Sequence, residues 1–148
     1  MFKFRKNKPE QPYVRIEAAL LPAAAEVLRT AKVLKGISTT EIVRYAIAAY
    51  DAGLQADYAG DRIVAEHDSG FDELSIPTGI SIDTSVAHQK LAVNVNKKSH
   101  SILQMTQLLT GNDMDTTVNT ALLYYGEFAG AEMSGHQLRR VPNPNNPA

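Results

Sequence analysis

The chain contains no cysteine, which excludes disulfides, thiol catalysis and cysteine-based zinc sites. It also has no apolar run near the roughly 18 residues that a membrane-spanning helix requires. The N-terminal segment is basic, but no apolar stretch follows it, so it lacks the pattern of a signal peptide. These absences predict a cytoplasmic protein without a membrane partner.

Patterns typical of enzymes and metal sites are missing too. The four histidines include no pair at the i, i+4 spacing of a helical metal site, and there is no glycine-rich phosphate loop. Ser99, His100 and Ser101 bring hydroxyls next to an imidazole, but adjacency in sequence does not create the geometry of a catalytic triad. We therefore expect no enzymatic activity, no catalytic residues, no cofactor and no metal.

The formal net charge is −1, which is not typical of a globally basic nucleic-acid-binding protein. The charge is unevenly distributed. Residues 58–87 contain a single basic side chain, Arg62, among these acidic ones: Asp61, Glu66, Asp68, Asp72, Glu73 and Asp83. Cations gather at the N-terminus, at Lys3, Arg5, Lys6 and Lys8. We interpret residues 1–11 as a basic flexible arm and residues 58–87 as an acidic connector.

Two segments, 15–57 and 90–132, share an apolar pattern when Gly36 is aligned with Gly111. Apolar and polar side chains alternate over residues 91–96, as in a half-buried strand. The apolar spacing then becomes helical up to the glycine, which is suited to end a helix because it adopts a positive φ without a Cβ penalty. A second helical stripe follows each glycine. The repeat predicts two copies of a strand–helix–turn–helix unit.

Residues typical of helix N-termini precede the expected helices. Ser38 forms a capping box with Glu41 three positions later. Asn96 is suited to cap the first helix of the second copy, and Asp113 or Asp115 is suited to cap its second helix. These residues support the helix boundaries that the apolar pattern indicates.

Neither copy is expected to fold alone. A single strand leaves its backbone hydrogen bonds unpaired, and a pair of helices leaves its apolar stripe in water. Two copies in one chain remove both problems if residues 15–20 and 90–95 pair as antiparallel strands above four helices. We therefore expect the chain to build a complete unit from its own two halves.

The turn and second helix of each copy resemble those of a known family. Residues 36–50 read Gly-Ile-Ser-Thr-Thr-Glu-Ile-Val-Arg-Tyr-Ala-Ile-Ala-Ala-Tyr, and the second copy keeps Gly111, Val118, Ala121 and Tyr125 in register. The chain resembles the ribbon-helix-helix family of DNA-binding proteins, as two tandem copies. The resemblance implies a mainly α fold with a short antiparallel β-ribbon, arranged as a tandem ribbon-helix-helix, pseudo-two-fold single-chain unit.

The resemblance also divides the chain into parts. They are the basic arm 1–11, a first ribbon-helix-helix copy 12–57, the acidic connector 58–87, a second ribbon-helix-helix copy 88–133 and a disordered tail 134–148. Within the connector, Arg62 to His67 is suited to one helical turn, and Ile80 to Ile82 to a short edge strand. Arg139 and Arg140 in the tail are interpreted as phosphate contacts or as free side chains.

In function, the resemblance implies sequence-specific binding of double-stranded DNA by a ribbon in the major groove, as in a small transcriptional regulator or repressor of phage or plasmid type. The base-reading positions would be Arg15, Glu17, Lys90, Ala92 and Asn94. Asn94 is suited to adenine, and Arg15 or Lys90 to guanine. Glu17 is suited to accept from cytosine, to repel phosphate or to pair with Lys90 across the ribbon.

The resemblance further implies phosphate contacts at the start of the second helix, where free N–H groups and the helix dipole favour anions. In the first copy these residues are Ser38, Thr39 and Thr40, and the arm adds Lys3, Arg5, Lys6 and Lys8. In the second copy Asp113 and Asp115 bring negative charge to the corresponding place. Either the two half-sites are gripped unequally, or the second copy is a structural scaffold.

The alternative hypothesis is a protein-interaction module on the same scaffold. It would bind a partner protein through the acidic connector or through an altered ribbon. The near-neutral charge and the pair Asp113 and Asp115 favour this hypothesis. Under either hypothesis we expect a monomer or a homodimer.

Overall fold

The computed structural model describes residues 12–83 and 85–145. Within these residues the chain forms four helices and five strands. In chain order they are β1 (Tyr13–Leu20), α1 (Pro22–Lys35), α2 (Thr39–Tyr58), β2 (Asp61–His67), β3 (Gly70–Glu73), β4 (Gln89–Asn96), α3 (Lys97–Thr110), α4 (Met114–Met133) and β5 (Gln137–Pro142). The expected basic arm, with Lys3, Arg5, Lys6 and Lys8, lies outside the described residues.

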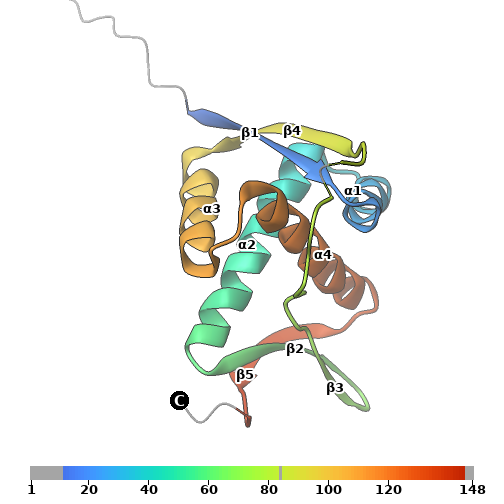
Figure 1. Cartoon of the computed structure of the whole chain (residues 1–148). Helices are drawn as coiled ribbons and strands as arrows, with labels where there is room; N and C mark the ends of the chain where they lie inside the picture. The colour runs from blue at the N-terminus through green and yellow to red at the C-terminus, as the bar shows by residue number, and fades with distance from the viewer. Residues whose placement is uncertain (1–11, 84, 146–148) are drawn as a thin grey trace, which may run out of the picture.

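Strands β1 and β4 form a two-stranded antiparallel ribbon at one end of the molecule (Figure 1). Ile16 is opposite Val93, and Ala18 is opposite Leu91. These four side chains are buried, whereas the residues that alternate with them are mostly exposed. The predicted antiparallel pairing of residues 15–20 with 90–95 is therefore confirmed.

The helices repeat along the chain with equal lengths. Helices α1 and α3 each have 14 residues, and α2 and α4 each have 20. Gly36 and Gly111 follow α1 and α3 with φ values of 65° and 75°, as predicted for glycines that end a helix in the left-handed region. The Asn96 side chain accepts a hydrogen bond from the Ser99 N–H, which confirms it as the N-cap of α3.

One hydrophobic core lies between the ribbon and the helices. Helices α2 and α4 cross beneath the ribbon, with α1 and α3 at its two sides (Figure 1). Tyr50 of α2 and Tyr125 of α4 are buried together with the inner face of the ribbon. Burial of these side chains fixes which face of the ribbon points to solvent.

A second antiparallel sheet, in the order β3-β2-β5, closes the opposite end of the molecule (Figure 1). Ile63 and Ala65 of β2 pack in a second core with Tyr124 of α4. The Tyr124 hydroxyl donates to the Leu74 carbonyl at 3.2 Å. The segment between the two copies and the segment after the second copy thus cover the C-terminal halves of α2 and α4.

The predicted fold class is wrong. Among the described residues 51% lie in helices and 25% in strands, and the strands form two separate sheets. A mainly α tandem ribbon-helix-helix layout does not describe this mixed architecture. The buried run Ile63-Val64-Ala65 forms a central strand instead, and it pairs on both sides with segments expected to be a linker and a tail.

Four local expectations are corrected with it. Arg62 to His67 belongs to β2 and is not a helical turn, and Ile80 to Ile82 has no regular structure. The tail expected to be disordered contains β5. Arg139 and Arg140 of β5 are not free side chains. Arg139 pairs with Glu66 at 3.0 Å, and Arg140 pairs with Asp61 at 2.7 Å. The division into functional parts otherwise stays a prediction.

None of the helices within residues 12–83 and 85–145 combines the length and the apolar character that crossing a membrane would need.

Candidate nucleic-acid interface

The outward face of the ribbon carries the side chains predicted to read bases. The register pairs Arg15 with Asn94, Glu17 with Ala92 and Ala19 with Lys90. All five predicted residues, Arg15, Glu17, Lys90, Ala92 and Asn94, are exposed. The alternation of each strand explains this arrangement, because the buried partners Ile16, Ala18, Leu91, Val93 and Val95 turn the intervening residues outward.

Glu17 has a different partner from the one predicted. Its carboxylate accepts a hydrogen bond from Arg15 Nε at 3.0 Å, along the same strand, while Lys90 is opposite Ala19. Both members of the pair are more than half exposed, so the ion pair contributes about 1 kcal/mol or less. A guanidinium has further N–H groups beyond Nε, so Arg15 keeps hydrogen-bonding capacity for a ligand.

Ser38 at the start of α2 is used by the helix itself. Its hydroxyl oxygen accepts from the Glu41 N–H at 3.2 Å, and the Glu41 carboxylate accepts from the Ser38 N–H at 3.4 Å. The predicted capping box is therefore confirmed. Because the cap occupies Ser38 and brings the Glu41 carboxylate to the helix start, Ser38 is poorly suited to hold a phosphate.

A wide groove of about 650 Å³ lies between α1, the start of α2 and the outer edge of β4. Thr39 and Thr40, the other two predicted phosphate residues, line it. Arg29, Lys32 and Lys90 bring positive charge to it from α1 and β4. The structure thus brings both threonines together with one base-reading candidate at a single basic surface, which we call the β4 groove.

Arg29 and Lys32 are not among the residues predicted from the sequence to contact DNA. Both are exposed on α1, each directly after a buried residue, Leu28 or Ala31. Arg29 pairs with Glu26, and this hydrogen bond lowers the pKa of the Glu26 carboxyl. Among the described residues neither Lys32 nor Lys90 has an acidic partner within ion-pair distance.

The start of α4 is arranged differently. Asp113 is the N-cap, and the Thr116 N–H that donates to its carboxylate at 2.8 Å lowers its pKa. Asp115 does not cap the helix, because its carboxylate accepts from the Ala19 N–H on the outer edge of β1 at 3.1 Å. Fully buried Asn119 accepts from the Leu21 N–H and donates to the Ala19 carbonyl, both at 2.8 Å. Helix α4 therefore closes the β1 edge with its own polar side chains.

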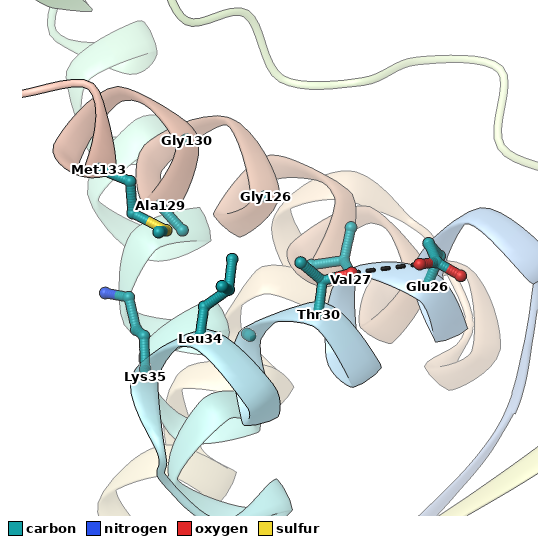
Figure 2. Close-up of a pocket in the computed structure, with 10 residues that line it drawn as sticks. Glu26, Val27, Thr30, Leu34, Lys35, Gly126, Ala129, Gly130 and Met133 are labelled. Atoms are coloured by element: carbon teal, nitrogen blue, oxygen red, sulfur yellow. Dashed lines mark hydrogen bonds between the residues drawn. The ribbon is translucent and has the colours of Figure 1, made fainter.

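An apolar hollow of about 230 Å³ lies between α1 and α4 (Figure 2). Leu34 and Met133 reach into it from the two helices, and Gly126 and Gly130 widen it on the α4 side. At its rim Thr30 donates to Glu26 at 3.2 Å. The hollow offers surface for apolar packing and no cluster of reactive groups.

Comparisons with known proteins do not add to this geometry. No family model matches the chain, and no curated protein or solved structure matches it either. The resemblance to the ribbon-helix-helix family therefore stays a prediction. Within the part of the chain that the structure describes, no three histidine or acidic side chains are grouped so that they could hold a metal ion.

Proposed function

We propose that the chain binds double-stranded DNA sequence-specifically through the outward face of the β1–β4 ribbon, as a small transcriptional regulator acting in the cytoplasm. The observation that carries the proposal is the register, in which Arg15 is opposite Asn94 on an exposed ribbon face. An antiparallel two-stranded ribbon fits the major groove, and its outward side chains then face base edges.

The chemistry of the two side chains supports base reading. Arginine binds guanine O6 and N7 with two N–H groups, and asparagine binds adenine N6 and N7 with its amide. Arg15 and Asn94 are direct neighbours across the ribbon, so they are suited to adjacent bases. Glu17 also supports this arrangement, since its hydrogen bond to Arg15 Nε limits the rotamers that the guanidinium samples before binding.

The second candidate function, a protein-interaction module, loses support at the acidic connector. Three of its carboxylates are engaged in ion pairs: Glu73 with Arg62, Glu66 with Arg139, and Asp61 with Arg140. The negative charge available to a partner protein is therefore smaller than the sequence suggests. A protein partner bound to the ribbon face would leave the chain without affinity for DNA at low salt, so the same experiment separates the two functions.

The test begins with selection of bound duplexes from a random DNA pool, followed by fluorescence anisotropy across a salt series. A DNA-binding protein should lose affinity steeply as salt rises, because bound phosphates release counterions. Asn94→Ala should weaken binding to the selected duplex by about 1–3 kcal/mol and leave binding to random DNA nearly unchanged. Exposed Gln137, on the distal sheet, provides the control variant Gln137→Ala. Absence of binding at low salt would contradict the proposal.

A further inference from the structure

We propose that the chain grips the DNA backbone on one side of the ribbon only: the β4 groove binds phosphates, and the aspartates of α4 exclude them from the β1 side. This inference rests on the proposed function and concerns how the same face engages its ligand. It assigns new roles to Arg29 and Lys32 as phosphate contacts and to Asp115 as a determinant that keeps phosphate away.

The β4 groove has the composition of a phosphate-binding surface. Lys32 and Lys90 supply two cations that have no acidic partner among the described residues, and Arg29 supplies a third that pairs with Glu26. Thr39 and Thr40 add hydroxyl groups at the start of α2, where the Glu41 carboxylate is held by the capping box with Ser38. Arginine, lysine and threonine side chains are among the groups that contact DNA phosphates, and these contacts set the position of a protein on the duplex. The groove runs beside the base-reading face because Lys90 and Ala92 belong to both.

Four of the five corresponding positions on the other side of the ribbon differ in chemistry, and the fifth, Arg15, corresponds to Lys90 and keeps a positive charge. When Gly36 is aligned with Gly111, Gln104 and Gln107 of α3 correspond to Arg29 and Lys32 of α1. At the start of α4, Met114 and Asp115 correspond to Thr39 and Thr40. Two cations are thus replaced by neutral amides, and a hydroxyl is replaced by a carboxylate. The β1 side would repel a phosphate that the β4 side attracts.

The outer edges of the two strands also differ in whether their backbone groups already have hydrogen-bond partners. On the β1 edge the Ala19 N–H is bonded to Asp115, and the Ala19 carbonyl to Asn119. Since these groups point away from β4, Ala19 and its partner Lys90 form a non-hydrogen-bonded pair, and the Lys90 N–H also points away from the ribbon. Lys90 lines the β4 groove, so that edge leaves a backbone donor where a phosphate would lie.

The carboxylate of Asp115 is held in place and cannot simply turn aside. Its hydrogen bond to the Ala19 N–H at 3.1 Å keeps it next to the β1 edge. The neighbouring Asp113 is equally engaged, with its oxygen 2.8 Å from the Thr116 N–H. Two fixed negative charges at this helix start fall within the screening length of about 8–10 Å from any phosphate that approached it.

The test is phosphate-ethylation interference on a duplex selected from the random pool. We expect interference at phosphates on one side of the contacted groove and none at the positions related to them by two-fold symmetry. Arg29→Gln and Lys32→Gln, which copy the α3 side, should each weaken binding to all duplexes and reduce the salt slope by about 1. Gln104→Ala, at the position corresponding to Arg29, is the matched control and should change neither.

Asp115→Asn provides an independent variant, because it removes the charge but keeps an oxygen that can accept from the Ala19 N–H. We expect it to tighten DNA binding and to add interference on the β1 side, with a small fall in melting temperature because the amide is a weaker acceptor and interacts less favourably with the helix dipole. Symmetric interference in the wild type, or salt slopes unaffected by Arg29→Gln and Lys32→Gln, would overturn the one-sided grip while leaving DNA binding intact. Failure to bind any duplex at low salt would overturn both the one-sided grip and the proposed function. The one-sided grip would also be overturned if the β4 groove bound a poly-glutamate peptide saturably and Arg29→Gln and Lys32→Gln abolished that binding without changing DNA affinity.

Discussion

Asn119 offers the sharpest test of how the ribbon is attached to the helices. Its side chain is 0% exposed and bridges α4 to the end of β1. Asn119→Ala removes the acceptor for the Leu21 N–H and the donor for the Ala19 carbonyl, two hydrogen bonds of 2.8 Å. The substitution leaves both partly buried backbone groups without their side-chain partner.

The expected loss of stability follows from these two orphaned groups. A buried backbone group without a hydrogen bond costs about 1–3 kcal/mol, and these two groups are partly buried, so each falls toward the lower end and the variant should lose about 2–4 kcal/mol. A loss of this size is a large part of the 5–15 kcal/mol that is typical of a folded domain. With urea slopes of about 1–3 kcal/mol/M, we expect the unfolding midpoint to fall by about 1–3 M.

Urea unfolding followed by circular dichroism measures this midpoint. Gln104→Ala, on the exposed side of α3, is the control and should stay within about 0.5 kcal/mol of the wild type. An Asn119→Ala midpoint equal to that of the control would show that the two hydrogen bonds do not stabilise the fold, and the account of α4 as the closure of the β1 edge would be refuted.

Further predictions concern glycines and tyrosines. Gly36→Ala should destabilise by about 1–2 kcal/mol because its φ is 65°, whereas Gly130→Ala, in a helix with open space around the new methyl group, should stabilise by about 0.5–1 kcal/mol; opposite signs in urea unfolding are required. Gly53→Ala should reduce the free energy of unfolding by about 1–3 kcal/mol and lower the melting temperature, since its Cβ would lie 2.6 Å from the Tyr124 ring. An unchanged melting temperature would contradict that packing. Burial raises the pKa of Tyr124 and Tyr50 above 10.0, so the unfolded chain releases these protons first. Between about pH 8 and 10 stability should stay nearly constant, and above about pH 10 it should fall, with a smaller fall in Tyr124→Phe; melting curves between about pH 8 and 11 measure this.

The parts of the fold that the sequence predicts are those that depend on residues close together in the chain. The alternation of Leu91, Val93 and Val95 indicates a half-buried strand without reference to any partner, and the structure confirms it. Gly36 ends its helix at positive φ for a reason that lies in the glycine itself, and the Ser38–Glu41 capping box spans three positions. Local chemistry decides these features, so local patterns reveal them.

The second sheet could not be predicted in this way. Strand β2 pairs with β5, so that Asp61 is opposite Pro142 from the other end of the chain. Residues 137–142 contain two adjacent arginines and end in proline, a pattern typical of a tail unless carboxylates on another strand pair with the arginines. The run Ile63-Val64-Ala65 was the available signal, since three consecutive buried residues fit a central strand better than a solvated linker.

The candidate site likewise contains residues that local patterns predict and residues that only the packing of distant segments brings together. Strand parity predicts which side chains face outward, and all five predicted base-reading residues lie on the exposed face. Arg29 and Lys32 become relevant only when α1 is packed beside β4. The hydrogen bond between the Ala19 N–H and the Asp115 carboxylate joins residues far apart in the chain. It depends on the angle at which α4 meets β1, and no local sequence pattern encodes that angle.

Because β1 and β4 belong to one chain, ribbon assembly is a first-order event. A ribbon built from two separate chains dissociates on dilution, and its stability cannot be separated from protein concentration. Here the two strands stay tethered at any concentration, so a few molecules per cell would carry intact ribbons. The tether also frees each strand to change alone: a substitution in β1 alters one half of the reading face, whereas in a homodimer it would appear in both halves at once.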